Sequence, residues 1–457
     1  MFSIEMSGLV PFDTLLYWQR PRTVFLEVTN TCNLRCVTCH HFRDDFRFEK
    51  GHMEWDFFER VVSGIDDVRT LCLFASGEPL IAKHWDRMID FCLKSMDAGQ
   101  SLGFSTNGMF LNMDKIMPLI GKNVIINVSV DGATRKTFEN IRRGASFNRL
   151  IGNLELLCKL KEEHHTDMPH LQMSFVAWKE NIMELPQVAE LASRYGAREL
   201  NVVHRIFLDE DDFYKDSLVF HEDLFDRYLE KTVKVCENNG VRLVHTGTFS
   251  DSIPPTEGLK ETFFRETADG GLTCRITSEQ AIICFNGAVR ACCYVDRLFM
   301  GNLHYDGLND IWNGPIYRQL RLALNGGQYP DDCKSCSFLQ VLKMERRACL
   351  SPLNTGSVIL SSPPIKQSYS ATTLDKEFRD AMNNWKGGRL SSDDLITCLF
   401  GMWEKDNNLF EIANNIGIIY FLKGILPDAI DWLNKAARLM PSDENIRKNH
   451  SILIASS

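Results

Sequence analysis

The chain has 457 residues, of which 44% are hydrophobic and 24% charged, values typical of a core-forming globular protein long enough for roughly three domains. Its net charge of -9 offers no basic surface to nucleic acid, its start lacks a signal-peptide pattern, and no run of about 18 apolar residues could cross a membrane. We therefore expect a cytoplasmic protein without a nucleic-acid or membrane partner, whose 15 cysteines favour metal ligation over disulfide bonds.

After a lead-in over residues 1–22, short apolar runs alternate with amphipathic stretches as far as residue 240. The apolar runs, which are typical of strands, cover residues 23–29, 70–75, 101–106, 124–130, 171–177 and 199–205. Helical patterns cover residues 53–65, 85–96, 147–162, 183–195 and 221–239. The alternation predicts an α/β fold with a parallel sheet, and a partial (β/α)6 barrel of the TIM type over residues 23–240 is its simplest closure.

Three cysteines, Cys32, Cys36 and Cys39, follow the first predicted strand directly. In a barrel of this type the chemistry lies at the carboxyl ends of the strands, which is where this loop falls. Three thiolates can bind one face of an iron–sulfur cube. Because such a cluster normally takes four cysteines, one iron would stay open to a ligand that is not protein. A zinc knuckle is the alternative, although zinc sites usually show paired C-x2-C units and four ligands.

Turns with hydrogen-bonding side chains follow the next three predicted strands. They are Ser76-Gly77-Glu78-Pro79, Ser105-Thr106-Asn107-Gly108 and Ser129-Val130-Asp131-Gly132. Each of them alone is an ordinary strand-to-helix turn. We nevertheless expect all three at the same barrel rim as the cysteine loop, where they could act together.

These segments together resemble the core of the radical S-adenosylmethionine (SAM) enzymes. The resemblance implies that the three cysteines hold a [4Fe–4S] cluster whose open iron binds SAM. It also implies SAM contacts from Gly77, Glu78, Pro79, Thr106, Asn107, Ser129, Asp131 and Arg142. The turn around Glu78 would hold the amino group, Arg142 would reach the carboxylate, and the others would line the methionyl and ribose groups. Two positions depart from the family pattern, since Ser76 replaces a glycine and Thr38 replaces the usual aromatic residue near adenine.

The activity that this resemblance implies is reductive cleavage of SAM to methionine and a 5′-deoxyadenosyl radical, which takes a hydrogen atom from the substrate. An electron donor such as flavodoxin or ferredoxin is implied as a partner. Candidates for handling the substrate are His204, Arg205 and Asp209, which end or follow the sixth predicted strand. For the acidic run that begins at Asp209, a solvated loop is the alternative.

A second group of cysteines lies within residues 241–350. Cys274 comes first, an Asn-Gly pair signals a hairpin with Cys292 at its base, and Cys333 and Cys336 form a C-x2-C pair. Four thiolates would close a cluster completely. Zinc is again the alternative, because four thiolates suit zinc equally well.

This arrangement, with the landmarks at residues 301–303 and 308–313, resembles the shortened SPASM or twitch module of radical SAM enzymes. The resemblance implies one auxiliary [4Fe–4S] cluster. Its ligands would be Cys274, Cys292, Cys333 and Cys336. The roles of Cys284, Cys293 and Cys349 stay open.

The last part of the chain has a different pattern. Residues 351–370 are rich in serine and read as a linker, and residues 371–457 turn helical. Small residues around Gly417 and Ala429 fall on the spacing of a tetratricopeptide repeat (TPR), of which one copy is evident. Because one repeat cannot bury its face alone, we expect this TPR-like tail to dock on the barrel, on a second subunit or on a partner protein.

Three functions fit these features. The helical tail favours a radical SAM enzyme that modifies a peptide or protein side chain by maturation, oxidation or crosslinking. The single auxiliary cluster and the short lead-in, which leaves no room for a leader-peptide-binding domain, favour a dehydrogenase or epimerase of a sugar-like or aminocyclitol small molecule. A non-catalytic scaffold that binds a partner through its tail is the third, and the complete cysteine loop argues against it.

Overall fold

The computed structural model describes residues 20–39, 49–65, 68–97, 99–207, 210–257, 264–266, 272–292, 298–325, 329–330, 333, 371–405, 409–439 and 444–456. Within these ranges ten strands form one sheet, in the order β12-β11-β10-β1-β2-β3-β4-β5-β6-β7. Strands β1 to β7 are Thr23–Leu26, Thr70–Cys72, Ser101–Thr106, Val124–Ser129, His170–Ala177, Glu199–His204 and Arg242–Val244. Each of these strands pairs in parallel with the next, which confirms the predicted parallel sheet and adds β7 to the six expected strands.

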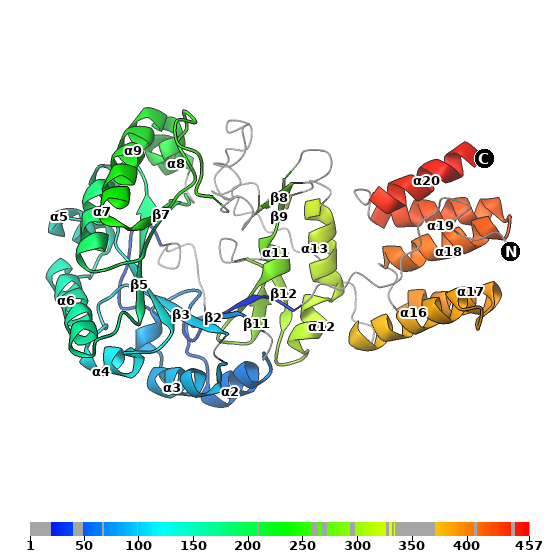
Figure 1. Cartoon of the computed structure of the whole chain (residues 1–457), viewed down its shortest axis with the longest axis horizontal. Helices are drawn as coiled ribbons and strands as arrows, with labels where there is room; N and C mark the ends of the chain where they lie inside the picture. Colours follow the sequence, from blue (N-terminus) through cyan, green and yellow to red (C-terminus); the bar gives the residue numbers. More distant parts are fainter. Residues whose placement is uncertain are drawn as a thin grey trace.

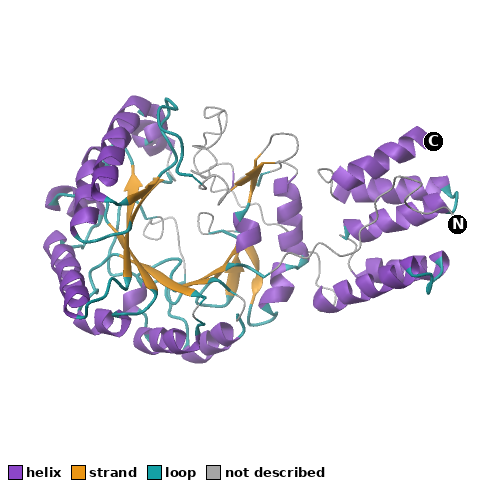
Figure 2. Cartoon of the chain, viewed as in Figure 1, coloured by secondary structure: helices purple, strands orange, loops and turns teal. Residues whose placement is uncertain are grey.

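The sheet curves into an open arc with helices along its outer side (Figures 1 and 2). These helices are α2 Trp55–Ser63, α3 Trp85–Ser95, α4 Met113–Ile116, α5 Arg135–Ile141, α6 Phe147–Glu163, α7 Leu185–Arg194, α8 Glu210–Asp216 and α9 Glu222–Asn239. α9 ends where Gly240 adopts the left-handed conformation with φ of 67°, a common way for a helix to stop. Because β7 and β12 are the two edges of the sheet, the barrel is partial.

The two faces of the sheet differ in polarity. On the outer face, Val24 and Leu26 of β1 belong to the same buried apolar cluster as Phe58 of α2. On the other face, the Asn127 side chain of β4 donates to Ser105 Oγ of β3 at 3.1 Å and to Ser174 Oγ of β5 at 3.4 Å. The inner wall of the arc is therefore polar along β3, β4 and β5, while the apolar core lies between the sheet and the helices.

The segment that carries the second cysteine group continues the barrel sheet. Its elements are β8 Phe264–Glu266, β9 Leu272–Cys274, α11 Ile276–Glu279, β10 Gln280–Ile283, β11 Ala288–Arg290, β12 Phe299–Asn302, α12 Leu308–Trp312 and α13 Pro315–Asn325. The predicted hairpin is β10–β11, with Gly287 in its turn at φ of 83°. β10 pairs in parallel with β1, so this module shares a strand ladder with the barrel.

The tail is helical, as expected, with helices α16 Ala371–Lys386, α17 Ser392–Lys405, α18 Phe410–Leu422, α19 Leu426–Leu439 and α20 Glu444–Ser456. It lies beyond α12 and α13 in Figure 1. A Cβ atom at Gly417 of α18 would fall 2.7 Å from Cγ of Leu433 in α19, so these two helices approach closely because of the glycine. Its assignment as a TPR remains a prediction, and the linker over residues 351–370 lies outside the described residues.

None of the helices in the described ranges combines the length and the apolar character needed to cross a membrane.

Candidate functional site

The cysteine loop leaves the carboxyl end of β1 and is bound to the connection between α5 and α6. The backbone N–H of Arg35 donates to the carbonyl of Arg143, and that of Val37 to the carbonyl of Ile141, each at 2.9 Å. Gly144, at φ of 93°, lies against the loop, because a Cβ atom there would be in ordinary contact, at 3.6 Å, with the carbonyl oxygen of Asn33. These contacts give the loop a defined path across the barrel rim.

Two thiols of the loop have the surroundings that an iron–sulfur cluster needs. Burial raises the pKa of the Cys32 and Cys36 thiols, while the positive charge of Arg142 acts in the opposite direction. The Leu34 N–H donates to Cys32 Sγ at 3.4 Å, and the Asn107 amide group donates to the same sulfur at 3.9 Å. Hydrogen bonds to sulfur and limited solvent exposure are the main ways in which a protein tunes such a cluster.

The donor set fits the implied [4Fe–4S] cluster, since Cys32, Cys36 and Cys39 lie on one loop. Among the residues that the structure describes, no three Cys, His, Asp or Glu side chains are already gathered closely enough to hold a metal ion. The assignment of the three ligands therefore rests on the placement of the loop and on its neighbours. Metal binding has to deprotonate these thiols, so loading the cluster releases protons.

A buried carboxylate, Glu78, stands beside this loop. Gly77, at φ of 71°, allows the turn after β2 to approach β1, since a Cβ atom there would fall 2.5 Å from the Thr31 carbonyl oxygen. The Glu78 carboxylate, which is 1% exposed, accepts hydrogen bonds of 2.7 Å from Thr106 Oγ1 and from the Asn107 N–H. Burial raises the pKa of Glu78 to about 7, although these hydrogen bonds act to lower it. An ammonium group is the natural partner for such a carboxylate.

The predicted residues of the second and third turns therefore meet. Gly77, Glu78 and Pro79, which opens the short helix η2 Pro79–Ile81, are joined through the Glu78 carboxylate to Thr106 and Asn107. The Asn107 amide also donates to Asn33 Oδ1 at 2.9 Å, which links the third turn directly to the cysteine loop.

A buried ion pair lies on the other side of the loop. Arg142 Nη2 is 2.8 Å from Asp131 Oδ2, and Asp131 is fully buried. Burial acts to lower the pKa of Arg142, but Asp131 and Cys36 outweigh it and hold this pKa above its ordinary value. Asp131 Oδ1 accepts from the Val176 N–H at 2.9 Å, so the pair is anchored to β5. A guanidinium held in this way can bind a carboxylate.

Ser129, the remaining predicted SAM contact, ends β4 on the polar inner wall. Its hydroxyl accepts from Ser174 Oγ at 3.5 Å.

One residue that the sequence analysis missed supports the neighbouring ion pair. The Asn181 side chain is fully buried and donates to the Asp131 carbonyl at 3.1 Å. Its sequence signal is weak, because an asparagine in a turn after a strand is ordinary.

The three candidates around the sixth strand have different surroundings. The Arg205 guanidinium lies 4.1 Å from the Trp178 ring and 4.6 Å from the Phe207 ring, and its Nη2 donates to the Val37 carbonyl at 3.4 Å. Arg205 thus contacts the cysteine loop itself. The His204 ring packs on Phe225 with ring centres 4.7 Å apart. Asp209 lies outside the described residues.

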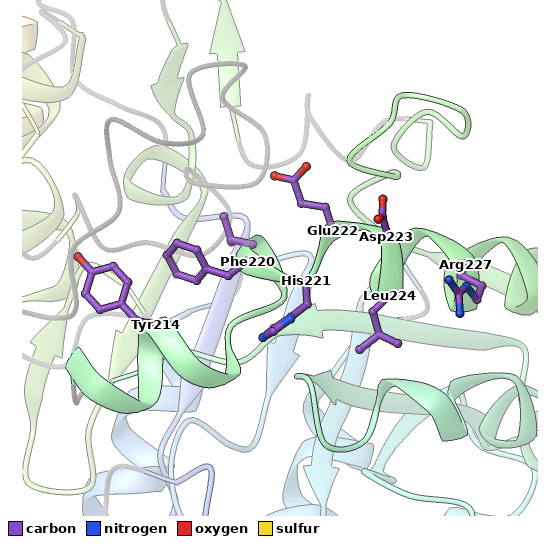
Figure 3. A pocket seen from close by; sticks show the side chains of 8 residues that line it. Tyr214, Phe220, His221, Glu222, Asp223, Leu224 and Arg227 are labelled. Carbon is purple, nitrogen blue, oxygen red and sulfur yellow. The ribbon is translucent and has the colours of Figure 1, made fainter.

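A cavity of about 840 Å³ lies along α8, the short helix η5 Leu218–Phe220 and the start of α9 (Figure 3). Tyr214 and Phe220 lie side by side in its wall with ring centres 5.3 Å apart, and Glu222, Asp223 and Arg227 line it as well. Phe213 contacts both rings and belongs to a small apolar cluster against which Val37 of the cysteine loop packs.

The second cysteine group is described in part. Cys274 is the last residue of β9. Cys292, two residues after the end of β11, is buried, and Cys274, Cys292 and Cys333 all pack against or within the main apolar cluster. The hydroxyl of Tyr317 in α13 donates to the Arg290 carbonyl at 3.2 Å, beside Cys292. Cys284 is buried at the end of β10, while Cys336, Cys293 and Cys349 lie outside the described residues. Three of the four predicted ligands thus lie in the described part of this module, whose strand β10 pairs with β1.

Comparison with protein families gives two matches along the chain. Residues 26–172 match the radical SAM superfamily, and residues 274–337 match the iron–sulfur cluster-binding domain called SPASM. The second match begins at Cys274 and ends one residue after Cys336.

Several characterised proteins are similar to this chain. The tungsten-containing aldehyde ferredoxin oxidoreductase cofactor-modifying protein of Pyrococcus furiosus is 24% identical over 69% of this chain and 87% of its own length. The mycofactocin maturase MftC of Mycobacterium ulcerans is 23% identical over 77% and 89%. Streptococcus suis SuiB, solved with its precursor peptide SuiA, shares the fold at a TM-score of 0.50 and 15% identity, over 74% of this chain and 72% of that one.

Proposed function

We propose that this chain, which matches the radical SAM superfamily and the SPASM iron–sulfur domain, is a radical SAM enzyme that cleaves SAM reductively and takes a hydrogen atom from a peptide or protein side chain. Its cofactors are SAM, a SAM-binding [4Fe–4S] cluster and an auxiliary iron–sulfur cluster. Cys32, Cys36 and Cys39 would hold the first cluster, which would supply the electron for reductive cleavage of SAM to methionine and the 5′-deoxyadenosyl radical.

The observation that carries this proposal is the pair of opposite buried charges beside the three-thiol loop. SAM has an amino acid end, with an ammonium and a carboxylate group. Glu78 accepts hydrogen bonds from the ammonium, whose positive charge offsets the burial that raises the pKa of this carboxyl and so favours its ionised form. Arg142, held by Asp131 at 2.8 Å, binds the carboxylate. The two residues together orient SAM across the loop of Cys32, Cys36 and Cys39.

The substrate binds where the inner wall of the barrel meets the rim. The wall presents hydroxyl and amide groups from β3, β4 and β5, which suit a polar backbone. The cavity beside α8 adds the ring pair of Tyr214 and Phe220, and its volume of about 840 Å³ accommodates several side chains of an extended peptide. A peptide substrate also agrees with the relative whose name is mycofactocin maturase.

An oxidation of the substrate needs a second electron acceptor. Hydrogen-atom transfer to the 5′-deoxyadenosyl radical leaves a substrate radical, which becomes a two-electron-oxidised product when it loses one electron and one proton. An auxiliary cluster held by residues such as Cys274 and Cys292 would accept that electron, and a flavodoxin or ferredoxin would supply the electron that starts each turnover.

Anaerobic reconstitution tests the cofactor chemistry. We expect about eight irons per chain, as two [4Fe–4S] clusters require, and formation of 5′-deoxyadenosine from SAM with a strong reductant. The variant Cys32→Ala/Cys36→Ala/Cys39→Ala should keep about four irons and form no 5′-deoxyadenosine. Iron near zero in the native chain, or intact SAM after reduction, would overturn the proposal.

The substrate class can be tested without knowing the substrate. Extract from cells of the source organism grown in deuterated medium is added to the reconstituted enzyme, and mass spectrometry measures deuterium in 5′-deoxyadenosine. A peptide substrate predicts that protease digestion of the extract abolishes the transfer while periodate oxidation of its sugars does not. The opposite pattern would favour the small-molecule alternative.

A further inference from the structure

A buried ion pair joins the barrel to the SPASM segment. Arg290 Nη2 of β11 lies 3.4 Å from Glu27 Oε2, and both side chains are only 4% exposed. The two residues are 263 positions apart in the chain. Neither residue belongs to a motif recognised in the sequence, and the chemistry proposed above uses neither.

Strand register places both side chains on the inner face of the sheet. Phe25 of β1 is the partner of Ile282 in β10, and Ile282 is the partner of Arg290 in β11, so these three residues share a face. Glu27 follows Phe25 by two residues and continues the ladder, since its N–H donates to the Ile283 carbonyl at 2.9 Å. It therefore lies on the same face, opposite the one on which Leu26 packs beneath α2.

Each partner of the ion pair lies a few residues before a predicted cluster ligand in the sequence. Glu27 precedes Cys32 of the open-iron loop by five residues, and Arg290 precedes Cys292 of the auxiliary group by two. The Arg290 backbone is held as well, because its carbonyl accepts from the Tyr317 hydroxyl at 3.2 Å. Arg290 is thus fixed at its side chain by the barrel and at its carbonyl by α13.

We infer that Glu27 and Arg290 are positioning residues that hold the auxiliary-cluster ligand Cys292 in register with the SAM-cluster loop. The inference rests on the two-cluster function proposed above. A buried ion pair is a poor source of stability, because apolar residues of similar volume often serve as well or better, but its fixed geometry can select one arrangement of the parts that it joins. Electron transfer between two redox centres slows steeply as their separation grows. Because the proposed function has the auxiliary site take an electron from a substrate that reacts beside the SAM-cluster loop, a fixed register has a direct functional use, and the transfer rate between the two clusters reports their separation.

The test replaces the charges by apolar side chains of similar length, in Glu27→Met/Arg290→Met. This pair should fold, because neither charge is left buried without the other. The auxiliary cluster is measured alone when the double variant is made in the Cys32→Ala/Cys36→Ala/Cys39→Ala background. There we expect about four irons, as in the parent, but a changed electron paramagnetic resonance spectrum and a shifted midpoint potential of the auxiliary cluster. In the chain with both clusters, freeze-quench measurement should show at least tenfold slower electron transfer between them.

A matched control breaks an exposed ion pair far in sequence from both cysteine groups. Lys94 Nζ and Asp90 Oδ2 of α3 lie 2.7 Å apart with both side chains exposed, and Asp90→Asn should leave the spectrum and the transfer rate unchanged. The more conservative Arg290→Lys keeps the charge and should restore part of the native transfer rate.

Two results would contradict the inference in distinguishable ways. If the double methionine variant folds and keeps the native spectrum, potential and transfer rate, the pair does not position Cys292, and the two-cluster function stands. If the native chain with the triple alanine loop holds no iron, the two-cluster function fails and the inference fails with it.

Discussion

Arg318 of α13 and Glu411 of α18 form an ion pair of 3.5 Å whose side chains are 5% and 0% exposed. The pair joins the SPASM segment to the helical tail of the same chain. α13 also carries Tyr317, which touches the strand leading to Cys292. The tail therefore contacts the SPASM segment of its own chain, a surface that was not among those expected for it.

Loss of one charge of this pair should loosen the tail. We expect Glu411→Gln to destabilise tail docking by about 3–5 kcal/mol, the usual cost of removing one partner of a buried ion pair. Hydrogen exchange of the α18 amides measures this effect. The control is Glu377→Gln, which breaks the partly exposed pair with Lys405 at 2.9 Å and should cost less than about 1 kcal/mol. Equal protection of α18 in both variants would show that the Arg318–Glu411 pair does not secure the tail.

Glu78 should give the cofactor-free protein a pH-dependent stability. Its pKa is about 7 in the folded chain against an ordinary value of 4.5, so the folded state binds the proton more tightly between these two values. The free energy of unfolding should therefore fall as the pH rises from about 4.5 to about 7, by on the order of 3 kcal/mol at 1.36 kcal/mol per unit.

Urea unfolding at pH 5 and pH 8, under reducing conditions, measures this loss against Glu78→Gln, which cannot titrate. We expect the native chain to lose stability relative to the variant at the higher pH. A constant difference between the two proteins across this range would mean that Glu78 has the same pKa folded and unfolded.

The Asp131–Arg142 pair should control SAM affinity. Asp131→Asn keeps the shape of the side chain but removes its charge-assisted contact with Arg142. Such a contact is worth about 1.5–3 kcal/mol, so we expect SAM to bind roughly tenfold to hundredfold more weakly. Iron content should not change, because Asp131 is not a ligand. Calorimetric titration with SAM measures the affinity. Glu139→Gln, which breaks an exposed pair with Arg135 in α5, is the control, and an equal effect of both variants would refute the prediction.

Arg205 should protect the cluster on the cysteine loop. Its guanidinium stacks on Trp178 and donates to the Val37 carbonyl, contacts that a lysine cannot reproduce together. We expect Arg205→Lys to lose iron to a chelator several-fold faster than the native chain, as followed anaerobically by visible absorbance. Arg198→Lys, at an exposed pair with Asp167, should behave like the native chain. Unchanged iron loss in Arg205→Lys would leave Arg205 without a role in holding the loop.

Local patterns in the sequence predicted much of the fold and of the candidate site of this protein. The spacing of Cys32, Cys36 and Cys39, the turn at Glu78 and the alternation of strands and helices are visible because each involves residues close together in the chain. The resemblance to radical SAM enzymes depends on these short segments, and the family matches over residues 26–172 and 274–337 confirm it. The ligand and SAM-contact assignments stay predictions.

Only the tertiary structure decided how these segments are joined. Glu27 and Arg290 are 263 residues apart, and Arg205 is 168 residues from Val37, so no sequence window contains either contact. Strand order brings them together, since β10 inserts beside β1 and β6 ends above the cysteine loop. A charged residue in an otherwise apolar strand is ambiguous in sequence, because its cost or use depends on whether the fold supplies an opposite charge.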